Sequence, residues 1–164
     1  MACALSQGRG TQCNDSIGGL DFIEFAEIDT LGAITYDVTD TDVVTAFAGT
    51  PVWYKYELNS SANNYVENII SDADAGTTYF EQVLTLSLKR LDAVSTKEIK
   101  LMAYGLNHVR ITDRNGNVFI MGLEKGAKIT SGSSATGGAL GDFSGYNLTI
   151  SANEKTGANF YTGS

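Results

Sequence analysis

The sequence predicts a mainly β protein: a β-sandwich or barrel with one flanking α-helix, an extended N-terminal arm and long loops. Apolar and polar residues alternate in several segments, which is the period of a half-buried strand. Charged residues are 18% of the chain, below the usual quarter or so. Glycine, threonine and tyrosine are common instead, and that composition favours strands and turns. Only one segment, near the middle, has the spacing of a helix, so we expect it to cover an open end of the β structure.

The chain of 164 residues has the length of one domain. Residues 1–19 are polar and glycine-rich and contain little apolar surface apart from Leu5 and Ile17. We therefore expect these residues to form an N-terminal arm that becomes ordered against an adjacent subunit. Residues 20–164 are expected to form a single β domain.

Period-two alternation predicts most of the strands. It is clearest at Leu84, Leu86 and Leu88, where polar residues occupy the positions between. That pattern indicates one buried face and one face that is wet or lines something. The predicted strands are residues 20–29, 32–40, 51–59, 63–71, 77–91, 108–113, 118–124 and 145–155. Residues 39–49 fit neither period, and residues 127–131 extend or follow the strand before them.

The predicted helix covers residues 95–107. Ser95 and Glu98 have the spacing of a capping box, in which each side chain bonds a free backbone N–H of the first turn. Apolar residues then follow at helical spacing and are expected to pack against the core. These are Ile99, Met102, Ala103 and Leu106. Further along, Asn115-Gly116 predicts a hairpin with a type I′ turn, in which both central residues have positive φ.

The net charge of −8 and the pI near 4.5 argue against sequence-independent nucleic-acid binding, which depends on lysine and arginine displacing counterions. Metal binding is not expected either, because the chain has one histidine and lacks the spacing of metal motifs. The run DVTDTD, with Asp37, Asp40 and Asp42, lacks the glycine and distal glutamate of a calcium-binding EF-hand loop. It is interpreted as an acidic surface loop.

The opening residues lack the apolar stretch of a signal peptide, and no window is apolar enough to span a membrane. We therefore expect synthesis in the cytoplasm without membrane insertion. Cys3 and Cys13 are interpreted as free thiols in a reducing compartment, although a disulfide between them stays open.

No arrangement of residues predicts catalysis, and we expect no catalytic, cofactor-binding or metal-binding residues and no cofactor. His108 follows the predicted helix and has no nucleophile motif such as GxSxG to serve, so it is assigned to packing or a turn. The glycine-rich run SGSSATGGALG lacks the lysine of a phosphate-binding loop. A small hydrolase using scattered carboxylates is a remote alternative.

Two segments and the β-helix-β order between them resemble the tail tube proteins of tailed bacteriophages. The first is ALSQGRGTQCNDSIGGL and the second is ITDRNGNVFIMGLEKGAKITSGSSATGGALGDFSGYNLTISANEK. The resemblance runs along nearly the whole chain and is most specific in the second segment. Short phage structural proteins that begin with a Cys- and Gly-Arg-containing arm are similar as well.

The resemblance implies a tail-tube-like β domain at residues 20–164 that assembles into hexameric rings. Such rings stack into a hollow tube through which DNA leaves the capsid, and the fold is shared with contractile injection and type VI secretion tubes. The implied protein is a structural virion component of the tail. Its implied partners are copies of itself, other tail or neck proteins, and DNA passing through the lumen without specific binding. Single-ring neck, collar, terminator and hub proteins use the same fold.

Three further interpretations remain open at this stage. The run from Ser131 to Gly141 is either a loop that lies against a neighbouring subunit or a disordered surface loop. Acidic residues either face the lumen, where they repel phosphate, or provide solubility. In the former case lysine and arginine should concentrate at subunit contacts. A carbohydrate-binding or adhesin-like β module would be favoured if Trp53, Tyr54 and Tyr56 shared an exposed face; otherwise they are strand residues on both faces.

Overall fold

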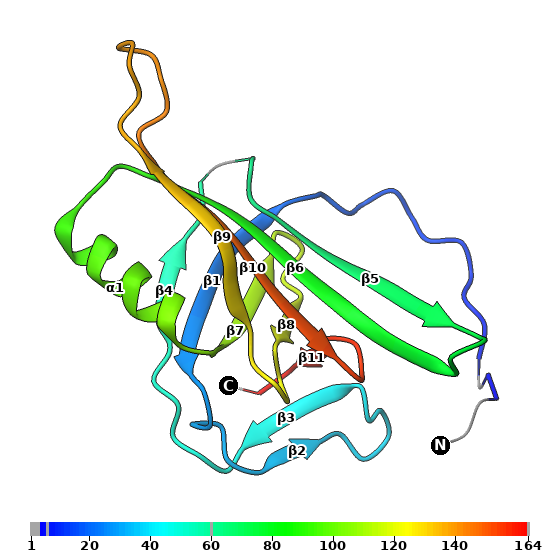
Figure 1. Ribbon diagram of the computed structural model, residues 1–164. Coiled ribbons are helices and arrows are strands. Elements are labelled where there is room, and N and C mark those ends of the chain that lie inside the picture. The colour runs from blue at the N-terminus through cyan, green and yellow to red at the C-terminus, as the bar shows by residue number, and fades with distance from the viewer. Residues whose placement is uncertain (1–3, 6, 60, 164) are drawn as a thin grey trace.

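A computed structural model describes residues 4–5, 7–59 and 61–163. Within these residues the chain forms eleven strands in two sheets and one helix, arranged as a sandwich with the helix at one end (Figure 1). The predicted fold class, a mainly β sandwich with one flanking helix, is confirmed.

The larger sheet has seven strands and the smaller has four. In spatial order the larger contains β2 (Ile34–Tyr36), β3 (Val43–Phe47), β11 (Asn159–Tyr161), β8 (Val118–Met121), β7 (Asn107–Asp113), β1 (Leu20–Glu27) and β4 (Tyr54–Glu57). The smaller contains β5 (Asn64–Asp72), β6 (Thr77–Lys89), β10 (Gly145–Glu154) and β9 (Lys128–Ala135). Neighbouring strands are antiparallel except β11 and β3, which are parallel.

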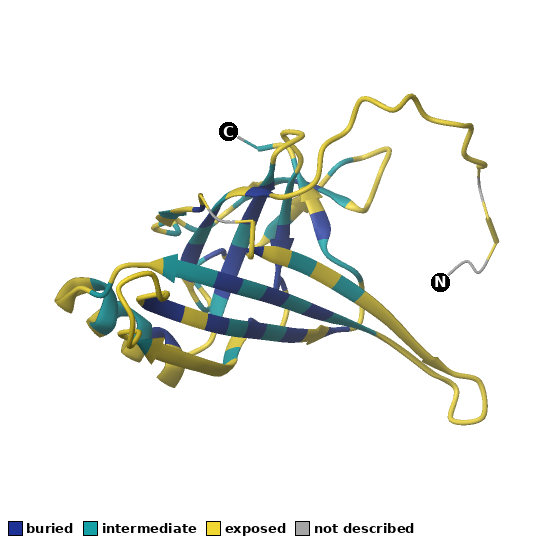
Figure 2. Ribbon diagram, turned by 90° about the horizontal axis from the view of Figure 1, so that it is seen from above, coloured by how far each residue is buried: buried dark blue, intermediate teal, exposed yellow. Residues whose placement is uncertain are grey.

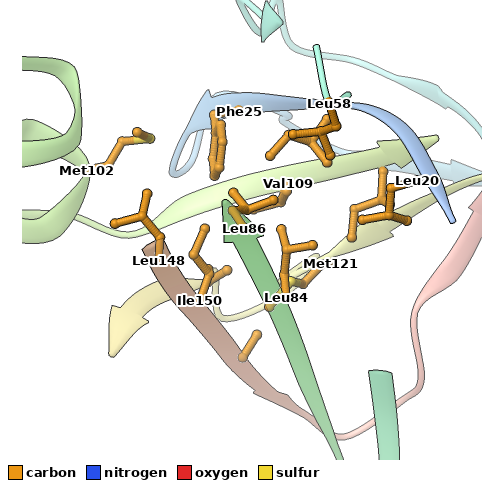
Figure 3. Packing of buried hydrophobic residues seen from close by; sticks show 14 of the residues in the cluster. Leu20, Phe25, Leu58, Leu84, Leu86, Met102, Val109, Met121, Leu148 and Ile150 are labelled. Carbon is orange, nitrogen blue, oxygen red and sulfur yellow. The ribbon is translucent and has the colours of Figure 1, made fainter. Parts of the chain in front are cut away.

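The main core lies between the two sheets (Figure 3). Leu84 and Leu86 of β6 are fully buried and belong to one cluster with Ile23 of β1 and Val109 of β7. A second, smaller cluster around Val44 packs beneath the β2–β3 end of the larger sheet. The alternation of β6 is confirmed, since Thr85 and Ser87 on its other face are partly exposed. Each fully buried leucine contributes roughly 2 kcal/mol through removal of its side chain from water.

Helix α1 spans Ala93–Tyr104, and its N-cap is Asp92 rather than the predicted Ser95. The Asp92 carboxylate accepts hydrogen bonds from the backbone N–H of Ser95 at 2.7 Å and from the Ser95 hydroxyl at 2.7 Å. The helix thus begins earlier than predicted. Ser95 lies in its first turn and Glu98 in its second, so the predicted capping box is wrong. Aspartate at the N-cap serves the same purpose, because it satisfies an N–H that has no partner within the helix.

The helix is attached to the sandwich by a narrow apolar stripe. Met102 is buried and Ile99 is partly buried against the main core. Ala103 and Leu106 are exposed, so the predicted packing stripe is only half as wide as expected. Polar contacts support the helix start, where the Tyr146 hydroxyl of β10 donates a hydrogen bond to the Asp92 carbonyl at 3.0 Å.

Part of the predicted glycine- and serine-rich loop is a strand. Residues Ser131 to Ala135 belong to β9, which pairs with β10 along most of its length. Small side chains permit this pairing: a Cβ at Gly132 would lie 2.8 Å from Cδ2 of Leu148. Residues 136–144 form the remaining loop, which projects beyond the sheet (Figure 1).

The β7–β8 hairpin is confirmed, but its turn is not type I′. Gly116 has a φ of 83°, whereas among the described residues other than glycine only Asp29 and Arg90 have positive φ. The Asp113 carboxylate instead accepts the backbone N–H groups of Asn115 and Asn117, each at 2.8 Å. These hydrogen bonds hold a turn that is longer than the two-residue type I′ turn and that requires a positive φ only at Gly116.

Replacing Asp92 with alanine is expected to lower the melting temperature of the domain, because the first turn of α1 loses its cap. Glu98→Ala is the matched control, since removal of its side chain leaves the cap intact. Thermal unfolding followed by circular dichroism measures both variants. An equal loss in both would contradict the assignment of the N-cap to Asp92.

Candidate functional site

His108 is a buried structural residue of β7. Its side chain is 3% exposed, and Nδ1 donates a hydrogen bond to the carbonyl oxygen of Gly122 at 2.7 Å. Burial lowers the pKa of His108, and the bond to Gly122 opposes that shift. The neutral imidazole therefore joins β7 to the end of β8, as a packing role requires. In the part of the chain that the structure describes, no three His, Cys, Asp or Glu side chains are arranged as metal ligands.

The acidic run after β2 uses its carboxylates to hold its own backbone. One oxygen of Asp37 accepts the N–H groups of Asp40 at 3.0 Å and Thr39 at 2.8 Å, and these bonds lower the pKa of Asp37. Asp40 accepts the N–H of Asp42 in the same way. These contacts are those of an acidic surface turn, as the sequence predicts.

The aromatic residues around β4 do not share an exposed face. Trp53 is partly buried against the smaller core cluster, and the guanidinium of Arg110 lies 4.5 Å from its ring centroid. Tyr56 packs edge-on against Phe25 of the main core at 5.3 Å. Tyr54 alone of the predicted trio is well exposed, at 60%. The three side chains therefore offer no common platform for a sugar ring.

The four-stranded sheet turns one face toward the core and the other toward water. By the strand alternation, the wet face of β6 and β10 presents hydroxyl and amide side chains, such as Thr85, Ser87, Asn147 and Thr149. The charged residues in register on this face are two acids, Asp72 and Glu81, and two bases, Lys89 and Lys128. This face is therefore close to neutral, and the acidic excess of the chain lies elsewhere.

Both outermost strands of the four-stranded sheet lack a second partner strand in the described part of the chain, and α1 lies beside β9. β5 and β9 are its outermost strands, and each has one hydrogen-bonding side without a partner strand among the described residues. β5 is nine residues long, and exposed apolar side chains gather where it forms a hairpin with β6. These are Val66, Ile69 and Ile70 on β5 and Tyr79 on β6. A long edge strand with exposed apolar residues is a ready template for pairing with another chain.

A groove of about 780 Å³ lies between the β5–β6 hairpin, the residues around β11 and the turn after β2. Phe80, Phe160 and Tyr36 provide apolar walls. Asp42, Glu67 and Glu124 make the lining acidic, against one base, Lys155. We call this feature the acidic groove.

Glu67 is held rigidly at the side of the acidic groove. Its Oε2 accepts three hydrogen bonds: from the Ala158 N–H at 2.7 Å, the Tyr65 hydroxyl at 3.1 Å and Gln82 Nε2 at 3.2 Å. Oε1 lies toward Gly157, where an added Cβ would be 2.8 Å away. The carboxylate is thus fixed in one orientation, with its second oxygen beside a glycine of the groove lining.

Glu154, at the end of β10, is a buried carboxylate with one satisfied oxygen. Its Oε1 accepts the backbone N–H of Lys125 at 2.9 Å, whereas Oε2 has no hydrogen-bond partner among the described residues. The side chain is 3% exposed, and burial raises its pKa against the opposing effect of the backbone N–H groups of Lys125 and Glu124. Burial at this position therefore disfavours the charged form of the side chain.

Glu67 and Glu154 were not predicted as site residues, although the sequence contains a signal for both. Glu154 follows Ile150 and Ala152 at the inward phase of β10, and Glu67 follows Tyr65 at the inward phase of β5. A charged residue in the buried phase of a strand is uncommon unless it is hydrogen-bonded. Such residues mark places where a carboxylate has a structural or binding task.

The N-terminal segment runs away from the sandwich (Figure 2). Residues 7–18 are exposed and form no strand or helix. Its inner end is fastened by Asn115, whose side chain accepts the Ile17 N–H at 2.9 Å and donates to the Ile17 carbonyl at 2.7 Å. Cys13 is exposed and is a free thiol, while Cys3 lies outside the described residues.

Comparisons with models of protein families, with curated proteins and with solved structures find no match to this chain. Within the described residues, no helix has both the length and the apolar character that crossing a membrane requires.

Glu154→Gln is expected to stabilise the domain at pH 8 and to lose that advantage near pH 4. The raised pKa means that the folded state holds the proton more tightly than the unfolded chain. Stability is therefore lost as the pH rises through the folded pKa, and an uncharged glutamine avoids this loss while keeping the acceptor for Lys125. Melting temperatures at both pH values measure the effect. Glu27→Gln is an exposed control, and an advantage of Glu154→Gln that is equal at both pH values would contradict the interpretation.

Proposed function

We propose that the protein is a structural virion protein, a subunit of a phage tail tube that self-assembles into rings. The observation that carries the proposal is the four-stranded sheet, whose two outermost strands have no second partner strand among the described residues and whose outer face is nearly neutral, with polar side chains along the middle of β6 and β10. The likeness of the sequence to tail tube proteins supports the same assignment. The proposed role is non-enzymatic.

The strand directions favour ring closure. The order β5-β6-β10-β9 is antiparallel throughout, so β5 and β9 run in opposite directions. When identical copies are related by rotation about one axis, β9 of one copy can meet β5 of the next as a further antiparallel pair. Repetition of this contact gives a closed barrel without exposed edges. Side chains such as Val66 on β5 would lie beside the neighbouring copy.

The outer face of the sheet suits a lumen that DNA passes through. Hydroxyl and amide groups remain hydrated, and two lysines balanced by two acids offer little attraction to a phosphate backbone. DNA would therefore meet a wall that neither binds it tightly nor repels it strongly. In this proposal the excess acids of the chain do not line the lumen, and they support solubility instead.

Negative-stain microscopy of the concentrated full-length protein is expected to show rings or tubes with a central hole. Long tubes identify the repeating subunit of a tail tube, while discrete rings identify a neck, collar, terminator or hub component. A protein that stays monomeric at high concentration and is absent from purified virions would contradict the proposal.

Val66→Lys is expected to reduce the number and length of these assemblies, because charge on an edge strand opposes pairing with a neighbour. Circular dichroism should report an unchanged fold, since Val66 is 44% exposed in the single copy. Thr35→Lys places the same charge on β2, the edge of the other sheet, and serves as the control. Equal loss of assembly in both variants would count against closure through β5.

Removal of residues 1–15 is expected to weaken assembly without changing the cooperative thermal unfolding of the single domain. The shortened chain keeps Ile17 and its two hydrogen bonds to Asn115, so the start of β1 stays fastened. Assembly is measured by sedimentation velocity and folding by calorimetry at low concentration. Loss of the cooperative transition would show that the segment belongs to the core.

A further inference from the structure

In the single copy the N-terminal segment is exposed to solvent along its described length, and the apolar walls of the acidic groove are only partly covered. Residues 7–18 are exposed, and added Cβ atoms at Gly8, Gly10 and Gly18 would have no neighbour within 4 Å. The acidic groove has Phe160 at 50% exposure and Tyr36 at 39% in its walls. Building on the proposed function, we propose that the N-terminal segment of one copy occupies the acidic groove of a neighbouring copy.

Charge identifies the two surfaces as complementary. Between Leu5 and Asn14 the sequence contains a single charged side chain, Arg9. The groove presents Asp42, Glu67 and Glu124 against Lys155. A guanidinium suits this environment because it can bond a carboxylate through two N–H groups at once. Glu67 is prepared for such a contact, since its three existing hydrogen bonds all end on Oε2.

The glycines on both partners allow a close approach. Gly8 and Gly10 flank Arg9, so the backbone around the guanidinium can lie flat against a wall. Gly157 lies beside Oε1 of Glu67, where any larger residue would cover that oxygen. Leu5, which is 99% exposed, supplies an apolar side chain to match Phe160 and Tyr36.

The length of the segment permits contact with another copy. About 12 residues lie between Leu5 and Ile17, and in extended form they span roughly 40 Å. A compact domain of this size has a radius of gyration of about 15 Å, so the reach is similar to the width of the domain. Ile17 is fastened to Asn115 and the segment leads away from the sandwich (Figure 2), so its free end can reach the groove of an adjacent copy.

Disulfide trapping between two full-length variants tests the contact. Both variants carry Cys3→Ser and Cys13→Ser; one adds Gly10→Cys and the other adds Thr156→Cys in the groove lining. Mild oxidation of the mixture is expected to give a mixed-disulfide dimer. Thr136→Cys, in the exposed loop after β9, replaces Thr156→Cys in the control and should give severalfold less dimer. Equal yields with the two partners would overturn the proposal.

A charge exchange tests the role of Arg9. Arg9→Glu in the Gly10→Cys variant is expected to reduce the mixed disulfide severalfold, and Glu124→Lys in the Thr156→Cys partner should restore it. Glu57→Lys on β4, outside the groove, should not restore it. A yield that is insensitive to Arg9→Glu would overturn the proposal. A single chain that carries both Gly10→Cys and Thr156→Cys provides a second check: if it forms only the intramolecular disulfide at high dilution, the segment occupies the groove of its own copy and the proposal is overturned.

The outcomes separate this contact from the proposed function. Tubes that form without any mixed disulfide would refute the placement of the segment in the groove and leave the tube assignment standing. A specific mixed disulfide from a protein that never forms rings or tubes would support the contact and refute the tube assignment.

Discussion

The structure depends on the burial of one face of the four-stranded sheet against the seven-stranded sheet. Leu84 and Leu86 of β6 and Ile150 of β10 are in the main core, so the alternate residues of both strands must face water. The register cannot shift by one residue without exposing the apolar set. The same constraint therefore determines which side chains form the outer face, and β5 and β9 are the outermost strands of that sheet. The surfaces proposed for assembly follow from the core.

Sequence patterns predicted the fold wherever the signal was local and periodic. The burial of β6 alternates from Gln82 to Ser87, and that of β10 alternates over most of its length. β11 was not predicted, because it has only three residues and exists through pairing with β3 and β8. The second half of β9 was not predicted either, because its serines and glycine resemble a loop. Pairing with β10 overrides that weak propensity, because small side chains fit beside Leu148.

Local rules were less reliable where two residues compete for the same task. Ser95 and Glu98 fit a capping box, yet Asp92 lies three residues earlier and accepts the Ser95 N–H itself. Asn115-Gly116 fits a type I′ turn, yet the Asp113 carboxylate stabilises a different turn. The acidic groove was beyond sequence reasoning, because Asp42, Glu67 and Glu124 come from separate parts of the chain. Only tertiary packing brings them together.

The distribution of charge explains why assembly would need a specific contact. Each copy carries a net charge of −8, so copies repel one another at low ionic strength. The acidic groove, with Asp42, Glu67 and Glu124 against Lys155, adds to that repulsion. Entry of Arg9 from a neighbouring copy would offset this local charge where it is most concentrated. Edge pairing through β5 and β9 then supplies the apolar and backbone contacts, and the arginine contact determines how neighbouring copies are placed relative to one another. A neutral outer face is left to form the wall of the channel.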